Sequence, residues 1–292
     1  MDIVWLPDAR PRARALAVGE FDGVHIGHRE VIRGSDTVLT FEPHPRAVVA
    51  PDSAPKLLTP LEIKADIVAG LGVRELVVIP FDGSFAAQSP EAFVEHVLVE
   101  QLGAERVSVG QDFRFGHRAR GDAALLKAQD AFETRVARMV ELDGSVVSST
   151  HIRGLVAAGE VESAARFLGA PFEMRGTVVH GDKRGRTLGY PTANLVPDPR
   201  LVVPDHGVYA CRAHVAGERH LAAVNVGVRP TFKTGRGLLV EAFLLDFEGD
   251  LYGETLSLEF VGRLRGEQRF ESVDALVEQM GRDVTETRRV CT

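Results

Sequence analysis

The sequence has little of several features that mark particular classes of protein. Its two cysteines, Cys211 and Cys291, lack the spacing of a metal site or a disulfide framework, which favours a reducing compartment. No window approaches the ~18 apolar residues of a membrane span, and the N-terminus lacks the ~7–15-residue apolar stretch of a secretory signal. The formal net charge is -7, and no long block of like charges indicates a nucleic-acid tail. We therefore expect a cytoplasmic protein with no nucleic-acid or membrane partner.

What is present fits two globular domains. The chain has 292 residues, of which 45% are hydrophobic and 26% charged, and about 150 residues per domain is usual. From residue 14 to about residue 141, β-rich runs alternate with helical patterns, which favours a doubly wound parallel sheet with helices on both faces. The expected strands are Ala15–Val18, Thr37–Phe41, Glu75–Ile79, Arg106–Val109 and Arg135–Val140, and the expected helices lie near His28–Arg33, Pro60–Leu71, Pro90–Leu102 and Gly121–Phe132.

The second part of the chain has a different pattern. Two short helices are expected across Ser148–Gly169, and the sequence becomes strand-like after residue 171. Several short strands without intervening helices favour an antiparallel barrel or sandwich, which a helix from Ser272 to about Val290 follows. The expected strands are Phe172–Val179, Gly207–Val215, His220–Val226, Leu239–Phe247 and Thr255–Val261. We place the boundary near Gly169–Phe172, which gives domains 1–170 and 171–292.

The first candidate site is GEFDGVHIGH, which runs from Gly19 to His28 at the end of an expected strand. A helix is expected to begin near His25 or Gly27, so His25 and His28, three residues apart, would share a face. Imidazoles beside a helix N-terminus can donate hydrogen bonds to phosphate oxygens, and Gly23 and Gly27 let backbone approach a ligand. In isolation the two histidines also fit ordinary turn residues or half a metal site.

The second candidate site is HGDKRGRTLGYPTANL, from His180 to Leu195. Its basic, glycine-rich first part differs from the usual P-loop but can cover phosphates through backbone N–H groups. Thr192 and Asn194 supply neutral oxygens that suit Mg²⁺ shared with nucleotide phosphates. Glu241 begins a largely apolar strand, where a carboxylate can accept a proton from a hydroxyl. Taken singly, these segments also fit a basic hairpin, a β-turn and a surface residue.

The strand–HxGH–helix arrangement resembles the nucleotidyltransferase superfamily. With FEPHP from Phe41, GQDFRFG from Gly110 and SSTHIR from Ser148, the sequence resembles the adenylyltransferase module of bacterial bifunctional riboflavin kinase/FAD synthetases. The resemblance implies that His25 and His28 contact ATP phosphates, and it also implies wider sets of contacts. The expected nucleotide-binding residues are Gly19, Phe21, Asp22, Gly23, Gly27, Ser149, Thr150 and Arg153, and the expected flavin-binding residues are Asp112, Phe113 and Phe115, of which the two phenylalanines also fit simple packing.

The second site resembles the riboflavin kinase module of the same enzymes. The matching motifs are GxVxHGxxRGRxLGxPTANL, GVYA, NVGVRPTF, a Glu-x-x-LLDF segment and DLYGE. The resemblance implies a barrel fold, Mg²⁺ ligation by Thr192 and Asn194 together with ATP, and Glu241 as the general base on the ribityl 5′-hydroxyl. The further nucleotide-binding residues implied are Gly181, Lys183, Gly185 and Arg186.

The chain departs from this family at three places. After Glu241 the family often has Val and then His, whereas this chain has Ala242 and Phe243. Only eight residues separate His28 from Thr37, fewer than the family usually has, which leaves open how the first two strands are joined. Glu20 stands where the family often has Asn or Thr. We interpret the sequence as a bifunctional enzyme that makes FMN from riboflavin and FAD from FMN with ATP and Mg²⁺. The alternatives are a riboflavin kinase whose adenylyltransferase domain is inactive and a non-catalytic flavin-binding protein.

Overall fold

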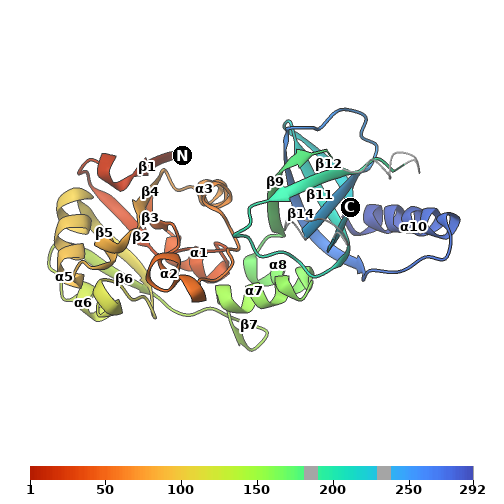
Figure 1. Cartoon of the computed structure of the whole chain (residues 1–292). Helices are drawn as coiled ribbons and strands as arrows, with labels where there is room; N and C mark the ends of the chain where they lie inside the picture. Colours follow the sequence, from red (N-terminus) through yellow and green to blue (C-terminus); the bar gives the residue numbers. More distant parts are fainter. Residues whose placement is uncertain (181–189, 229–237, 292) are drawn as a thin grey trace. The chain divides into compact units, whose positions relative to one another are not determined.

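The computed structural model describes residues 1–180, 190–228 and 238–291, and these residues form two compact units (Figure 1). The units are Met1–Ser149 and Thr150–Thr292. The helices α7 (Ser149–Ala157, apart from its first residue) and α8 (Val161–Leu168) thus fall with the second unit, whereas the sequence placed the boundary after them. The division at residue 170 stays a prediction. No helix in the described part of the chain has the length and apolar character needed to cross a membrane.

The first unit contains a six-stranded sheet in the order β1-β4-β3-β2-β5-β6, and every neighbouring pair is parallel. The predicted parallel sheet is therefore confirmed. The strand β1 was not predicted, because its four residues form an edge strand that is mostly exposed and has no buried face. The strands are β1 Asp2–Trp5, β2 Arg14–Val18, β3 Thr37–Glu42, β4 Glu75–Pro80, β5 Ala104–Gly110 and β6 Glu133–Ala137.

Alternate residues of the central strands enter two separate hydrophobic cores, one on each face of this sheet. Leu16, Val18 and Leu39 pack with the helical segment Phe93–Gln101, whereas Ala17 and Val38 pack with residues of α1 and α3. A doubly wound sheet requires this arrangement. The helices of the unit are α1 Ile26–Ile32, α2 Pro45–Val49, α3 Leu61–Gly70, α4 Gly83–Ala86, α5 Pro90–Ala92, the π-helix Phe93–Gln101 and α6 Ala123–Lys127, with short 3-10 turns at Leu6–Asp8, Pro51–Ser53 and His117–Ala119 and a hairpin of β7 Glu141–Leu142 and β8 Ser145–Val146.

Two of the expected helices differ from the structure. The segment expected as one helix over Gly121–Phe132 is helical only at Ala123–Lys127. Asp122 caps its N-terminus by accepting from the N–H groups of Ala124 and Leu125. The helix expected near Pro90–Leu102 begins as α5 and continues as a π-helix.

The connection between β2 and β3 answers how the shortened segment after His28 joins two parallel strands. The crossover comprises residues 19–36, because the loop 19–25 before α1 belongs to it as well as the shorter segment 33–36 after α1. A crossover between parallel strands needs about a dozen residues or more, so residues 19–36 are long enough to join β2 and β3. Leu16 lies opposite Thr37 in the ladder, and the two strands are direct neighbours.

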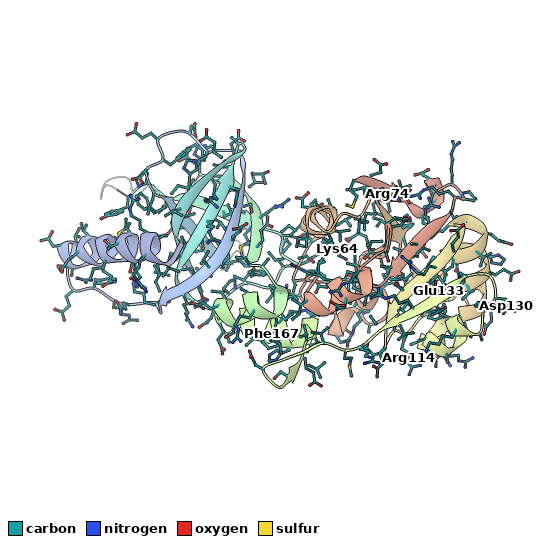
Figure 2. All side chains as sticks on the ribbon, turned by 180° about the vertical axis from the view of Figure 1, so that it is seen from behind. Lys64, Arg74, Arg114, Asp130, Glu133 and Phe167 are labelled. Atoms are coloured by element: carbon teal, nitrogen blue, oxygen red, sulfur yellow. The ribbon has the colours of Figure 1, made fainter. Side chains whose placement is uncertain are left out.

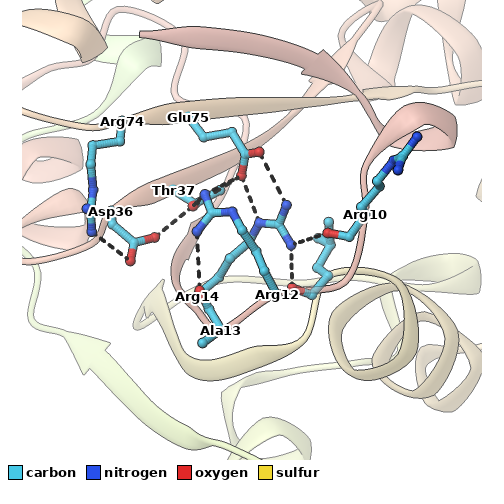
Figure 3. Close-up of polar contacts among 9 residues, drawn as sticks. Arg10, Arg12, Ala13, Arg14, Asp36, Thr37, Arg74 and Glu75 are labelled. Atoms are coloured by element: carbon cyan, nitrogen blue, oxygen red, sulfur yellow. Dashed lines mark hydrogen bonds and ion pairs between the residues drawn. The ribbon is translucent and has the colours of Figure 1, made fainter.

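Charged residues contact one another at the amino ends of β2 and β4 (Figure 3). The candidate site follows the carboxyl end of β2 instead. Arg14 is 2% exposed, and its Nε lies 2.7 Å from Oε2 of Glu75 on β4. Arg14 also donates to the carbonyl oxygens of Arg10 and Leu102, at 2.9 and 2.6 Å. Arg12 adds a second ion pair to Glu75 at 2.9 Å. The buried guanidinium thus has partners on several segments of the unit.

The second unit is a closed six-stranded barrel in the order β10-β13-β12-β11-β14-β9, with antiparallel neighbours. The predicted barrel and terminal helix are confirmed. Two strands coincide with their predicted bounds, whereas β10 was not predicted as a strand. The elements are α7 Ser149–Ala157, α8 Val161–Leu168, β9 Phe172–Val179, β10 Ala193–Pro197, β11 Gly207–Val215, β12 Glu218–Val228, β13 Leu238–Leu244, β14 Thr255–Arg265 and α10 Val273–Cys291.

Candidate active sites

The first site lies where the chain reverses its direction of travel across the parallel sheet. The strand β2 has β3 on one side and β5 on the other, and the loops after Val18 and Gly110 leave the adjoining carboxyl ends of β2 and β5. Ligands of doubly wound sheets bind at such a point. The fold therefore brings the GEFDGVHIGH and GQDFRFG segments to one edge, as the sequence predicted.

His25 and His28 are brought together as predicted, but His25 stands outside the helix as its N-cap. Its Nδ1 accepts from the backbone N–H of His28 at 3.1 Å. A neutral ring that accepts at Nδ1 carries its proton on Nε2, so His25 presents a donor at that atom. The two rings stack with centroids 3.5 Å apart and planes 14° from parallel.

His28 is held in its neutral form. Burial, together with the charges of His25 and Lys64, lowers the pKa of His28 well below its ordinary value. Its Nδ1 is buried without a hydrogen-bond partner among the described residues. A buried polar atom without a partner is rare in folded proteins, and a functional role is one explanation for it. The stacked pair can therefore offer hydrogen bonds to phosphate without adding a second positive charge.

The backbone of the loop before α1 is strained and closely packed. Phe21 and Val24 have positive φ values of 52° and 39°, a region that bulky side chains rarely adopt. A Cβ at Gly19 would lie 2.9 Å from the Phe21 ring, and one at Gly27 would lie 3.3 Å from the His25 ring. Gly23 has φ +89°, which glycine adopts without penalty. These glycines fix the positions of the aromatic rings.

Asp22 is hydrogen-bonded to other residues of the protein. It is 2% exposed, and its Oδ1 accepts from the backbone N–H groups of Leu58 and Thr59 at 2.8 and 2.9 Å. Its carbonyl oxygen accepts from Ser149 Oγ at 2.8 Å. Asp22 therefore positions the loop, and direct contact of Asp22 and Ser149 with a nucleotide stays a prediction.

The other residues predicted for the first site are placed as follows. Phe115 is 7% exposed and belongs to the hydrophobic core, where Phe113 stacks on it with centroids 5.5 Å apart. Asp112 is exposed in the loop after β5. Thr150 and Arg153 lie on α7 in the second compact unit, so their approach to the histidines stays a prediction.

Sequence reasoning missed Lys64, which lies on α3 and is only 2% exposed (Figure 2). Its Nζ donates to the carbonyl oxygen of Glu20 at 2.6 Å and to Thr40 Oγ1 at 3.2 Å. It also lies 3.3 Å from the carboxylate Oε1 of Glu20. The signal was a lysine among the apolar residues of a helix, which alone does not reveal its partners.

The second site lies on three neighbouring strands of the barrel. Asn194 on β10 faces Glu241 on β13, and Glu241 faces Asn225 on β12. Residues directly opposite in a ladder point to the same face, so these three side chains share one side of the sheet. Val240 and Ala242, which flank Glu241, are buried and point to the other side. Asn225 was not singled out from the sequence, although it opens the quoted NVGVRPTF motif.

A cavity of about 480 Å³ adjoins these strands. Thr192, Asn194, Glu248, Asp250 and Tyr252 are among its lining residues. Asn194 is 6% exposed. Glu241 lies opposite Asn194 in the ladder but is not one of the residues that line the cavity. The predicted residues Gly181, Lys183, Gly185 and Arg186 lie outside the described residues.

The oxygens of Thr192 and Asn194 fit a magnesium ion held jointly with phosphates. Both residues line the same cavity, and hydroxyl and amide oxygens are hard ligands of the kind that Mg²⁺ prefers. Neutral ligands leave the charge of the ion to be balanced by a nucleotide. The described residues contain no group of three or more His, Cys, Asp or Glu side chains placed to hold a metal.

The fold and the two sites define a class: an enzyme with a nucleotide-transferring α/β unit and a β-barrel kinase unit. Residues 8–151 match the family described as FAD synthetase, and residues 168–291 match the family described as riboflavin kinase. Curated bifunctional riboflavin kinase/FMN adenylyltransferases are similar over nearly their whole length. The protein from Listeria monocytogenes is 39% identical, with 94% of this chain and 91% of the relative covered. The protein from Escherichia coli K12 is 39% identical, with coverage of 95% and 93%.

The chain therefore belongs to the family of bifunctional riboflavin kinase/FMN adenylyltransferases. A solved structure described as a macrolide-efflux protein from Streptococcus pneumoniae superposes with a TM-score of 0.89 at 31% identity, over 99% of both chains. That description disagrees with the family names above. This likeness shows that the two chains share one fold over nearly their whole length. The efflux activity is part of the description of that protein and is not assigned to this chain.

Proposed function

We propose that this chain carries out two consecutive ATP-dependent reactions, in which it phosphorylates riboflavin to FMN and then adenylylates FMN to FAD. The observation that carries the proposal is the pairing of two separate sites in one chain. Stacked histidines stand at the ligand-binding edge of a parallel sheet, and a carboxylate faces a nearly buried Asn194 on a barrel. The family membership supports the same pair of activities.

In the kinase reaction, Glu241 accepts the proton of the riboflavin 5′-hydroxyl as its oxygen attacks the γ-phosphorus of ATP. A bond forms between that oxygen and phosphorus, the bond to the bridging oxygen breaks, and ADP leaves. Thr192 and Asn194 would hold Mg²⁺, which screens the charge of the phosphates during transfer. The exposed Glu248 and Asp250 add negative charge at the cavity, which repels the free nucleotide more strongly than its less negative magnesium complex.

In the adenylyl transfer, a phosphate oxygen of FMN attacks the α-phosphorus of ATP and pyrophosphate leaves. No covalent enzyme intermediate is needed, because positioning and electrostatic stabilisation supply most of the catalysis of such transfers. His25 presents the Nε2–H donor described above, and neutral His28 offers a second ring at van der Waals distance. Ser149, Thr150 and Arg153 are proposed to hold the triphosphate.

The test is a chromatographic time course of purified protein with riboflavin, ATP and Mg²⁺. FMN that forms first and FAD that follows would support both activities. FMN without FAD, even when FMN is supplied, would overturn the second activity, and neither product would favour a binding protein.

Two variants assign the sites. His28→Ala removes a hydrogen bond to the transition state, a loss that typically lowers the rate ~10²–10³-fold, so FAD formation falls while FMN formation stays. Glu241→Ala should abolish FMN formation and spare FAD formation from supplied FMN. Equal loss of both products in either variant would contradict the assignment of separate sites.

A further inference from the structure

Glu20 and Lys64 form a charged pair that no step of the proposed reactions uses. Glu20 lies two residues after the end of β2, at the edge where the histidines stand, and Lys64 reaches it from α3. Nζ of Lys64 binds the backbone oxygen, the carboxylate Oε1 and the neighbouring Thr40 hydroxyl, and Thr40 Oγ1 itself donates to the Glu20 carbonyl oxygen at 3.0 Å. A buried ammonium is thus fixed beside the candidate phosphate site.

One oxygen of the Glu20 carboxylate is left over in this arrangement. The side chain is 23% exposed, yet Oε2 is buried and has no hydrogen-bond partner among the described residues. An ionised carboxylate with an unpartnered buried oxygen is costly, whereas a protonated one carries no net charge there. The surroundings therefore favour the neutral acid.

Of the charged neighbours, the two carboxylates also favour the neutral acid, whereas the ammonium of Lys64 opposes it. Burial raises the pKa of Glu20 to about 7, against the opposing effect of Lys64, and the carboxylates of Asp22 and Glu42 raise it further. These three groups, from α3, the loop after β2 and the end of β3, are the charged neighbours of Glu20 in the described structure. The charge of Lys64 also lowers the pKa of His28, which places the ammonium near that ring.

We propose that Glu20 takes up a proton when the phosphate-bearing reactants of adenylyl transfer bind, and that Lys64 thereby directs its positive charge to those phosphates. The inference rests on the proposed function of this site. The proton comes from solvent and goes to the carboxylate of Glu20, and no covalent bond to a substrate changes. Incoming phosphate adds negative charge beside an acidic group, which favours protonation of that group. Glu20 is then a positioning residue that acts through Lys64.

The first experiment is the pH profile of kcat/KM for FAD formation from supplied FMN, which reports ionisations of the free enzyme. For the natural chain we expect kcat/KM to fall about tenfold per pH unit on the alkaline side. Glu20→Gln, which is neutral at every pH, should remove that alkaline limb. Glu62→Gln, an exposed carboxylate on the same helix as Lys64, is the matched control and should retain it. The same limb in Glu20→Gln would overturn the inference.

A second experiment needs no variant and no turnover. Pyrophosphate, the product of adenylyl transfer, is added with Mg²⁺ to the natural protein above neutral pH, and infrared difference spectroscopy follows the carboxyl C=O band. Growth of a protonated-carboxyl band is expected, and its absence would overturn the inference. Failure of the natural chain to form FAD at any pH would instead overturn the proposed function, while the pyrophosphate experiment would still decide whether the pair takes up a proton.

Discussion

Arg14 and Glu75 carry opposite charges where water screens them little. Arg14 is 2% and Glu75 12% exposed, and their side chains meet at 2.7 Å. Although burial raises the pKa of Glu75, the hydrogen bonds and charges of Arg14 and Arg12 outweigh it and hold that pKa below its ordinary value. Removing one partner of a buried pair leaves an uncompensated charge, which costs more free energy than replacing both partners by apolar residues. The pair therefore stabilises the folded sheet at neutral pH.

Glu75→Gln should lower the free energy of unfolding of the first unit by about 3–5 kcal/mol at pH 7. A depressed carboxyl pKa stabilises the fold above the unfolded value and loses this effect as the pH falls through the folded pKa, so the deficit should shrink in acid. Urea unfolding followed by Trp5, the single tryptophan and a residue of β1, reports this unit. Glu133→Gln, an exposed change on β6, should alter stability little. Equal effects of the two substitutions would contradict the prediction.

At the scale of single residues, the sequence indicated those candidates that belong to a short motif. His25 and His28 were found because they are neighbours in the chain and their spacing has a physical meaning. Lys64 was missed because its partners, Glu20 and Thr40, lie far from it in sequence. Only the folding of the sheet brings these residues into contact with it. Contact of Asp22 with a nucleotide stays a prediction, and the sequence did not reveal that its Oδ1 accepts from backbone N–H groups of a distant loop.

At the scale of elements, the predictable parts were the strands with a buried apolar run. β9 and β11 were predicted to the residue because each is long and lies between clear turn signals. β10 is five residues long and follows the Pro191 turn, so it was interpreted only as part of a motif. The crossover through α1 could not be derived from its length alone, since the sequence does not show how much of the loop belongs to it.

The helix α1 gives a prediction that separates stability from activity. Alanine in place of a helical glycine usually favours the helix by about 0.8–1 kcal/mol. At Gly27, however, the added Cβ would lie 3.3 Å from the His25 ring, so the ring must move. Gly27→Ala should therefore lower FAD formation by at least about tenfold without lowering the melting temperature, because small displacements of catalytic groups are costly. FMN formation should be unchanged.

The matched control for Gly27→Ala is Gly70→Ala, at the end of α3, where an added Cβ meets no atom within 4 Å. This variant should keep both activities. Unchanged FAD formation in Gly27→Ala would show that the position of the His25 ring is not critical. A parallel loss of both products would point to a general effect on folding.

At the scale of the whole molecule, the open point is where one unit ends and the other begins. The helix α8 contributes an apolar face to the second unit, with Val161 and Ala164 fully buried and Phe167 and Leu168 6% exposed. Arg263 on β14 donates from its backbone N–H to Glu162 at 2.9 Å and from its guanidinium to the Ala158 carbonyl oxygen at 3.2 Å. The barrel thus has both apolar and polar contacts with the helices that precede residue 170.

We expect a chain of residues 148–292, which keeps α7 and α8, to be more stable than a chain of residues 171–292. Loss of the buried face of α8 should lower the free energy of unfolding on the order of 5 kcal/mol, since each large apolar side chain contributes roughly 1.5–3 kcal/mol when buried. Calorimetry gives the melting temperature of each chain, and riboflavin phosphorylation shows whether the barrel is native. Equal melting temperatures would place the boundary at residue 170, as the sequence suggested. A cooperative transition in the longer chain alone would make the two helices part of the kinase domain.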